Sequence, residues 1–172
     1  MKRAMERVPR DVSVQLFRRE RRGIRFLMLR RTRARGGFWQ GVTGAPLHDE
    51  PDEAAALREV REETGWDVTT SLQPLQVSYS YALRDDLRDR WDQIYGPGVR
   101  EVEVVAFAAE APAGQEPRLD PEEHDRFGWF RFEEAEVMLD WPIEADALNG
   151  RRTALRTLVE RLREGRSDPE PD

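Results

Sequence analysis

The chain has 172 residues, of which 38% are hydrophobic and 36% charged, and its formal net charge is −6. This length and composition predict one soluble globular domain, over residues 1–164, with a buried core. The absence of cysteine excludes a disulfide framework, a thiol nucleophile and an iron–sulfur site. There is no apolar signal segment in residues 1–10 and no apolar run of roughly 18 residues that would cross a membrane, so we expect a cytoplasmic protein.

The charges are distributed unevenly along the chain. Residues 1–48 hold 13 basic and 3 acidic side chains, whereas residues 49–172 hold 15 basic and 31 acidic ones. All but one of the basic residues are arginines. A strongly basic first third indicates an acidic partner, which is either nucleic acid or a small acidic substrate.

Hydrophobic patterning predicts strands before and after a central helix. We expect strands at Asp11–Phe17, Ile24–Leu29, Phe38–Val42, Val68–Val77 and Val102–Ala109. Helices are expected at 54–63, Glu133–Leu139 and 151–164, with a long connection over Tyr81–Gly98 and a disordered tail over 165–172. This order of elements predicts a mixed α/β or α+β sandwich.

The first helix carries a cluster of carboxylates. Glu59, Glu62 and Glu63 are three or four residues apart and therefore share one helix face, while Leu57 and Val60 face the core. Such a cluster is either a solvated charged face or a set of oxygen ligands for a hard divalent cation such as Mg²⁺.

The residues around this helix favour the second interpretation. Gly44 is followed after five residues by Glu50, then after seven by Arg58-Glu59-Val60, and then by Glu62-Glu63 and Gly65-Trp66. This pattern resembles the Nudix box of the Nudix hydrolases at every fixed position over 23 residues. Trp66 differs in size from the aliphatic residue that is common at the closing position.

The resemblance implies an α/β fold, a Nudix-type α/β/α sandwich with a mixed sheet, in which Mg²⁺, with Mn²⁺ as a substitute, supports hydrolysis of a nucleoside diphosphate linked to another group. By this resemblance Glu59, Glu62 and Glu63 are metal ligands, and Arg58 orients a carboxylate. Gly44, Glu50 and Gly65 shape the loops on either side of the helix. Metal ions suit this chemistry because they neutralise phosphate oxygens and lower the pKa of the attacking water.

Flanking residues bear on the substrate. Residues 38–44, with the sequence Phe-Trp-Gln-Gly-Val-Thr-Gly, and residues 95–99, Tyr-Gly-Pro-Gly-Val, resemble the dihydroneopterin triphosphate pyrophosphatase branch, whose members also cleave dATP. Glu123-His124, followed by Trp129, resembles the place where this branch adds a glutamate to the metal site. This implies Glu123 as a fourth acid, a ligand or general base, with Glu122 as the alternative. His124 is expected to be a loop or packing residue.

Candidate substrate-binding residues precede the helix. Phe38 and Trp39 either stack on a flat ring or belong to the core, and Gln40 has the donor and acceptor to read a ring edge. Arg30 is our candidate for holding phosphate oxygens, although strand alternation allows only one of Arg30 and Arg31 to face the site.

The resulting hypothesis is a Mg²⁺-dependent pyrophosphohydrolase of a nucleoside or pterin triphosphate. Three alternatives stay open: a Nudix hydrolase of dinucleoside polyphosphates, nucleotide sugars or capped RNA; a non-catalytic nucleotide sensor; and a nucleic-acid-binding module. The expected partner is a small polyphosphate rather than nucleic acid or a membrane, and the sequence is compatible with a homodimer.

Overall fold

The computed structural model describes residues 8–139 and 145–165 of the chain. Most of the tail expected to be disordered, residues 166–172, lies outside this part. Among the described residues there is no helix that is both long and apolar enough to cross a membrane.

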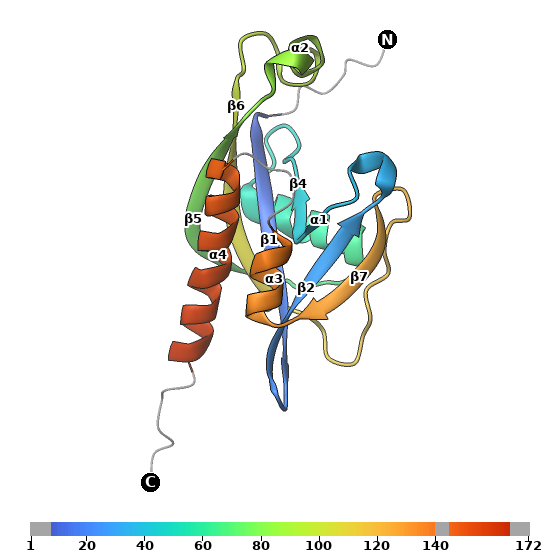
Figure 1. Ribbon diagram of the computed structural model, residues 1–172, viewed down its shortest axis with the longest axis vertical. Coiled ribbons are helices and arrows are strands. Elements are labelled where there is room, and N and C mark those ends of the chain that lie inside the picture. The colour runs from blue at the N-terminus through green and yellow to red at the C-terminus, as the bar shows by residue number, and fades with distance from the viewer. Residues whose placement is uncertain (1–7, 140–144, 166–172) are drawn as a thin grey trace.

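The described elements form one mixed sheet with helices on both faces (Figure 1). The strands are β1 (Arg10–Glu20), β2 (Gly23–Arg31), β3 (Trp39–Gln40), β4 (Val42–Gly44), β5 (Gln73–Ala82), β6 (Glu101–Glu110) and β7 (His124–Phe130). The helices are α1 (Asp52–Thr64), α2 (Arg88–Tyr95), α3 (Phe132–Met138) and α4 (Ala145–Glu164).

Strand β1 lies at the centre of the sheet. It pairs in parallel with β6 along one edge, whereas its other edge is shared between β4 and β2, both antiparallel. Strand β2 separates from β1 and continues the sheet through β7 and β3. Because β4 pairs with β1 at Val12–Val14, the loop that follows Gly44 begins beside the middle of the sheet.

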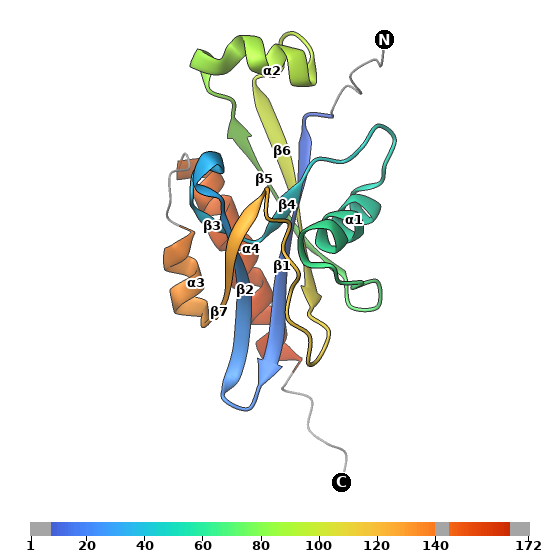
Figure 2. The same cartoon turned by 90° about the vertical axis from the view of Figure 1, so that its right-hand side faces the viewer.

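Two hydrophobic layers sandwich the sheet, with α1 on one face and α3 and α4 on the other (Figure 2). In β2, Leu27 and Leu29 pack toward α1, whereas Phe26 and Met28 pack toward α3 and α4. Successive side chains of a strand point to opposite faces, so a strand covered on both faces is apolar throughout. The expected α/β/α sandwich with a mixed sheet is confirmed.

The structure corrects several expected elements. The strand expected at Val68–Val77 begins only at Gln73, because Val68 fills the core from the turn after α1. The long connection over Tyr81–Gly98 contains the last residues of β5 and the helix α2, and β7 was not expected at all. The described part of helix α4 begins at Ala145, about 1.7 turns before the expected start at residue 151. The large Trp66 is buried and stacks on Trp129, whose ring centroid lies 6.2 Å away.

Candidate active site

The loop between β4 and α1 is held by one arginine of the helix. Arg58 donates from Nε and Nη2 to the two carboxylate oxygens of Glu50, at 2.9 Å each, and from Nη2 to the carbonyl of Ala45 at 3.0 Å. Glu50 also accepts the amide of Leu47 at 2.8 Å. Charge-assisted paired bonds of this kind are strong and directional, so the loop is fixed against the first turns of α1.

The same guanidinium reaches two of the candidate ligands. Nη1 of Arg58 donates to Glu59 at 2.7 Å and, at 3.3 Å, to Glu62. The bond with Glu50 raises the pKa of Arg58 and lowers the pKa of the Glu50 carboxyl. Glu50 is the principal partner of Arg58, because it accepts two bonds, whereas Glu62 is 59% exposed.

Glu59 depends on the absence of a side chain at Gly44. A Cβ built on Gly44 would lie 2.0 Å from Cδ of Glu59 and nearly as close to both of its oxygens. Burial raises the pKa of the Glu59 carboxyl to about 7, although Arg58 acts in the opposite direction. The carboxylate is therefore held at the end of β4 in an environment that opposes its charge.

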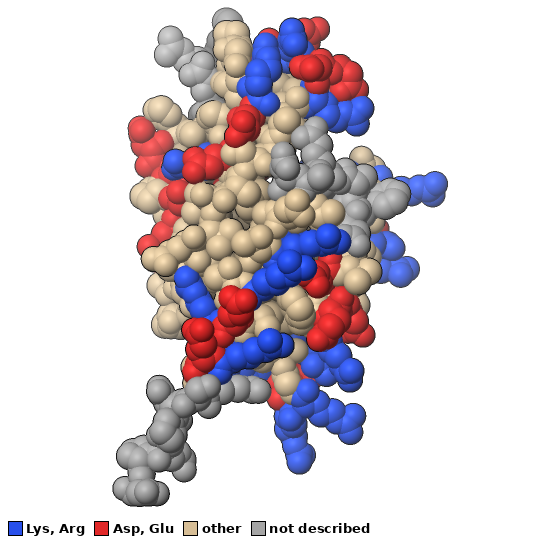
Figure 3. All heavy atoms as spheres, turned by 60° about the vertical axis from the view of Figure 1, so that its left-hand side comes forward, with Lys and Arg blue, Asp and Glu red and all other residues tan. Residues whose placement is uncertain are grey.

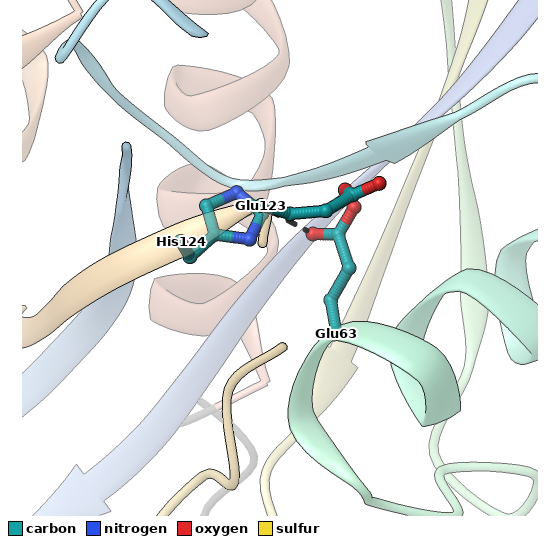
Figure 4. A group of neighbouring side chains, drawn as sticks. All are labelled: Glu63, Glu123 and His124. Atoms are coloured by element: carbon teal, nitrogen blue, oxygen red, sulfur yellow. Dashed lines mark ion pairs between the residues drawn. The ribbon is translucent and has the colours of Figure 1, made fainter. Parts of the chain in front are cut away.

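Glu63 lies one helical turn further on and faces Glu123 and His124 (Figure 4). Its side chain is 3% exposed, and neither carboxylate oxygen has a well-formed hydrogen bond within the described part of the chain. The backbone of Thr43 is close enough to favour the charged form, but this effect on the pKa is small. Burial raises the pKa of Glu63 well above the usual value, and the charges of Glu59 and Glu123 add to this effect. Oε2 of Glu63 lies 3.9 Å from Nε2 of His124.

Glu123 and His124 are positioned by the turn that leads into β7. The amide of His124 donates to the carbonyl of Asp120 at 2.9 Å, and the carbonyl of Glu123 accepts the amide of Thr32 at 3.0 Å. Arg35 lies 3.8 Å from the Glu123 carboxylate. These bonds bring the turn, which is distant from α1 in the sequence, beside Glu63.

His124 is wholly buried, and among the described residues neither of its ring nitrogens has a hydrogen-bond partner. Burial lowers the pKa of this imidazole to about 4, and the nearby Arg31 and Arg35 contribute in the same direction. The ring is therefore neutral at pH 7 and has a free electron pair on one nitrogen.

Two adjoining cavities open beside these residues. A polar cavity of about 620 Å³ contains Glu59, Glu62, Glu123 and the cationic side chains of Arg31 and Arg35. A more apolar cavity of about 340 Å³ is lined by rings and by Gln40; the rings belong to Phe38, Tyr79, Tyr81 and Trp91. Both cavities share residues that include Arg31, Thr43 and Tyr81. The result is one cleft with a charged half and an aromatic half.

The donor set fits a divalent cation. Glu63, Glu123 and His124 each offer one ligand atom, and these atoms lie within 4.8 Å of one another. Buried polar atoms are normally paired, yet the two oxygens of Glu63 and the nitrogens of His124 have no hydrogen-bond partner among residues 8–139 and 145–165. A cation supplies both the missing partner and the charge that the neighbouring carboxylates need.

Of the two arginines at the end of β2, it is Arg31 that lines the cleft. Arg30, the sequence-based candidate, instead bonds Asp125 at 2.7 Å on an exposed surface. Neither cavity includes Arg30, so the structure corrects this choice. Alternation along the strand places one arginine inside, and the irregularity between Arg30 and Arg31 opposite β7 accompanies their separation.

The aromatic candidates are also divided. Phe38 and Gln40 line the apolar cavity, whereas Trp39 packs edge-on against Phe130, with ring centroids 5.6 Å apart, in the core beneath α3. The structure thus places Trp39 with the core, the alternative kept open for it. Residues in β3 alternate between the two faces, which separates Trp39 from its neighbours.

The sequence did not indicate several residues that line the cleft. Tyr79 and Tyr81 come from β5, Trp91 from α2 and Arg151 from α4, and no local pattern connects these segments. His124, which the sequence predicted to be a loop or packing residue, is buried beside Glu63. Its position directly after Glu123 was the one signal of this neighbourhood.

On the face drawn in Figure 3, basic and acidic side chains lie side by side over the α2 end of the molecule and over α4. The arginines at the β1–β2 hairpin pair in part with acidic neighbours, since Arg18 contacts Glu20 at 2.7 Å and Arg19 contacts Glu110 at 3.4 Å. On this face the mixed charges do not form the basic stripe that is typical of nucleic-acid binding.

Comparisons with known proteins point to one family. A family model described as the NUDIX domain matches residues 7–150. The chain is 35% identical over 120 residues to an octanoyltransferase from Myxococcus xanthus, covering 70% of this chain but only 30% of that protein.

Comparison with solved structures points to the same family. The fold is similar to the dihydroneopterin triphosphate pyrophosphohydrolase of E. coli, with a TM-score of 0.70 and 26% identity over 91% of this chain and 99% of that one. It is also similar to a Listeria monocytogenes protein described as a NUDIX hydrolase, with a TM-score of 0.72 and 25% identity over 90% and 94% of the two chains. A C. elegans Ap4A hydrolase shares the fold, with a TM-score of 0.66 and 18% identity over 90% and 98%.

Proposed function

Because this chain belongs to the NUDIX domain family, we propose that it is a divalent-metal-dependent pyrophosphohydrolase of a nucleoside or pterin triphosphate. The substrate is of the dATP or dihydroneopterin triphosphate type, and the products are the monophosphate and pyrophosphate. The single observation that carries this proposal is the junction of a charged and an aromatic cavity in one cleft. Similarity to the E. coli dihydroneopterin triphosphate pyrophosphohydrolase supports the choice of substrate class.

The charged half accounts for the phosphates and the metal. Glu59, Glu62, Glu63 and Glu123 are the side chains that would hold Mg²⁺ or Mn²⁺, and such an ion would neutralise phosphate oxygens and lower the pKa of water. Arg58 holds Glu59 and the loop in position. A carboxylate of this group that is not saturated by metal accepts the proton of the attacking water; Glu62 and Glu123 are the more exposed candidates.

The cationic side chains facing the cleft bind the substrate itself. Arg31 and Arg35 line the polar cavity, and the guanidinium of Arg31 lies 5.9 Å from the centre of the Phe38 ring, at the boundary between the two halves. Arg31 is therefore placed to contact phosphate oxygens while Phe38 contacts the ring. An arginine fork is well suited to phosphate because it donates two parallel bonds.

The aromatic half accounts for a flat ring. Phe38, Tyr81 and Trp91 offer ring faces, and Gln40 offers both a donor and an acceptor at the cavity wall. Stacking on one aromatic side chain contributes about 1–3 kcal/mol per base. The proposal therefore assigns recognition of the ring to this half and hydrolysis to the other.

A substrate panel tests the proposal directly. The full chain is incubated with Mg²⁺ or Mn²⁺ and with dATP, other nucleoside triphosphates, dihydroneopterin triphosphate, a dinucleoside polyphosphate and a nucleotide sugar. We expect pyrophosphate and the monophosphate from a triphosphate. Cleavage only of the dinucleotide or the nucleotide sugar would favour the alternative Nudix activities and refute this substrate class.

Glu63→Gln separates an enzyme from a nucleotide sensor. An enzyme loses most of its turnover while keeping its folded circular dichroism spectrum, whereas a sensor binds nucleotide as before and shows no turnover in either form. The cytoplasmic location and the homodimer stay predictions of the sequence.

A further inference from the structure

The geometry points to His124 as a nitrogen ligand of the metal site that it forms with Glu63 and Glu123, so that the site prefers Mn²⁺ to Mg²⁺. This inference deepens the function proposed above by identifying the cation. It concerns metal binding alone, and its test needs no substrate.

The inference is based on the surroundings of the His124 imidazole. His124 is fully buried at the first residue of β7, and Figure 4 shows a ring nitrogen directed at the Glu63 carboxylate, while the Glu123 side chain extends past the ring to the same carboxylate. Neither ring nitrogen has a hydrogen-bond partner within the described residues, which is rare for a buried histidine. At 3.9 Å, Nε2 of His124 and Oε2 of Glu63 are too far apart for a hydrogen bond.

One cation bound by Glu63, Glu123 and His124 accounts for their close, unpaired donor atoms. Ligand atoms about 2.0–2.2 Å from one ion are about 3–4.4 Å from each other, and the three donors here already lie within 4.8 Å of one another. The Glu123 side chain is partly exposed and can rotate to close the remaining gap. His124 and Glu63 need little movement because both are held in the core.

The nitrogen donor determines which cation is favoured. Mg²⁺ selects oxygen ligands and retains several waters, whereas imidazole favours first-row transition metals. A site built only from the glutamates of α1 would have no such bias. The bias should therefore depend on His124 and not on the Nudix-type carboxylates.

The decisive experiment is pulsed electron paramagnetic resonance of Mn²⁺ bound to the full chain. The protein is produced with ¹⁵N-labelled histidine and, in parallel, with histidine of natural abundance. The chain has two histidines, and His48 is exposed beside the polar cavity, so both samples carry His48→Gln. We expect electron spin-echo modulation from a directly bound nitrogen that changes from the ¹⁴N to the ¹⁵N pattern on labelling.

Metal affinity gives a second measurement. The wild type should bind Mn²⁺ on the order of tenfold or more tightly than Mg²⁺, measured by calorimetry with each metal alone. His124→Gln should weaken Mn²⁺ binding on the order of tenfold or more and Mg²⁺ binding much less, since removing even a partner of a ligand costs about 10–100-fold.

The inference is overturned if bound Mn²⁺ shows no histidine nitrogen, if Mn²⁺ does not bind, or if His124→Gln leaves the Mn²⁺ affinity unchanged. Should His124→Gln fail to fold, the labelling experiment decides, because it requires no change in the core. Failure here leaves hydrolysis in the substrate panel untouched, and a nitrogen ligand in a protein that hydrolyses nothing would refute only the proposed function.

Discussion

Replacing Gly44 by alanine adds one methyl group where β4 meets α1. The new Cβ would lie 2.0 Å from Cδ of Glu59, while ordinary contacts begin at 3.4 Å, so the carboxylate must move by about 1.4 Å. The backbone of Gly44 does not need the left-handed region, because its φ is not positive, and alanine fits it without strain. A displacement of about 1 Å in a catalytic constellation can cost about 100-fold.

We therefore expect Gly44→Ala to lower kcat/KM by about 100-fold and to weaken metal binding by about 10-fold or more. Gly41→Ala is the matched control in the same segment. Its Cβ would meet the carbonyl of Val14 at 3.0 Å, so it disturbs the sheet without reaching Glu59. Hydrolysis rates, calorimetric metal affinity and melting temperature are measured for each.

A double-mutant cycle tests whether Gly44→Ala acts through Glu59. If Gly44→Ala acts through Glu59, it has little further effect in a Glu59→Ala background, and the two losses are far from additive. Unchanged catalysis and metal binding in Gly44→Ala, or fully additive losses in the cycle, would refute the assignment.

Three further predictions follow from the site. Arg58→Lys should lower kcat/KM by about tenfold or more and should also lower the melting temperature, because lysine cannot bind Glu50 through two parallel bonds. Unchanged values would contradict the role of the Arg58–Glu50 bonds in holding the loop. Phe38→Ala should raise KM by about 5- to 150-fold with kcat nearly constant, if stacking contributes about 1–3 kcal/mol, whereas a fall in kcat alone would contradict a binding role. In the metal-free protein the pKa of Glu59 is raised from 4.5 to about 7, so its contribution to stability is present below pH 4.5 and is lost as the pH rises through 7. The melting temperature of the wild type minus that of Glu59→Gln should therefore fall between pH 4.5 and 7.5, and a constant difference would disprove the shift.

Local sequence patterns predicted the helices and strands whose own residues show a clear apolar periodicity. The central helix was predicted over residues 54–63, and Gly65, which follows this range, adopts the left-handed conformation at its C-cap. Strand β7 and helix α2 were missed because exposed residues interrupt their apolar patterns. Their stability comes from neighbours distant in the sequence, such as β2 for β7.

The uneven charge along the chain also separates what the sequence predicts from what the fold decides. The sequence shows a basic first third and an acidic remainder, and the acids of α1 were correctly located on one helix. In the folded chain many of the arginines are neutralised by acidic residues far along the sequence, as Arg30 is by Asp125. Arg31 and Arg35 line the cleft, where Arg35 also pairs with Glu123, so the basic segment contributes two cationic side chains to this small site.

The sequence by itself determined the family, the carboxylate face of α1 and the expected chemistry, because the residues of the box lie within 23 positions and are related by helical spacing. The resemblance also implied Glu123 as a fourth acid, with Glu122 as the alternative. Only the tertiary structure placed Glu123 and His124 beside Glu63, Arg31 rather than Arg30 at the cleft, and Trp39 in the core. The physical reason is that strand register and long-range pairing set the face on which each side chain lies, and neither is encoded in a short stretch of sequence.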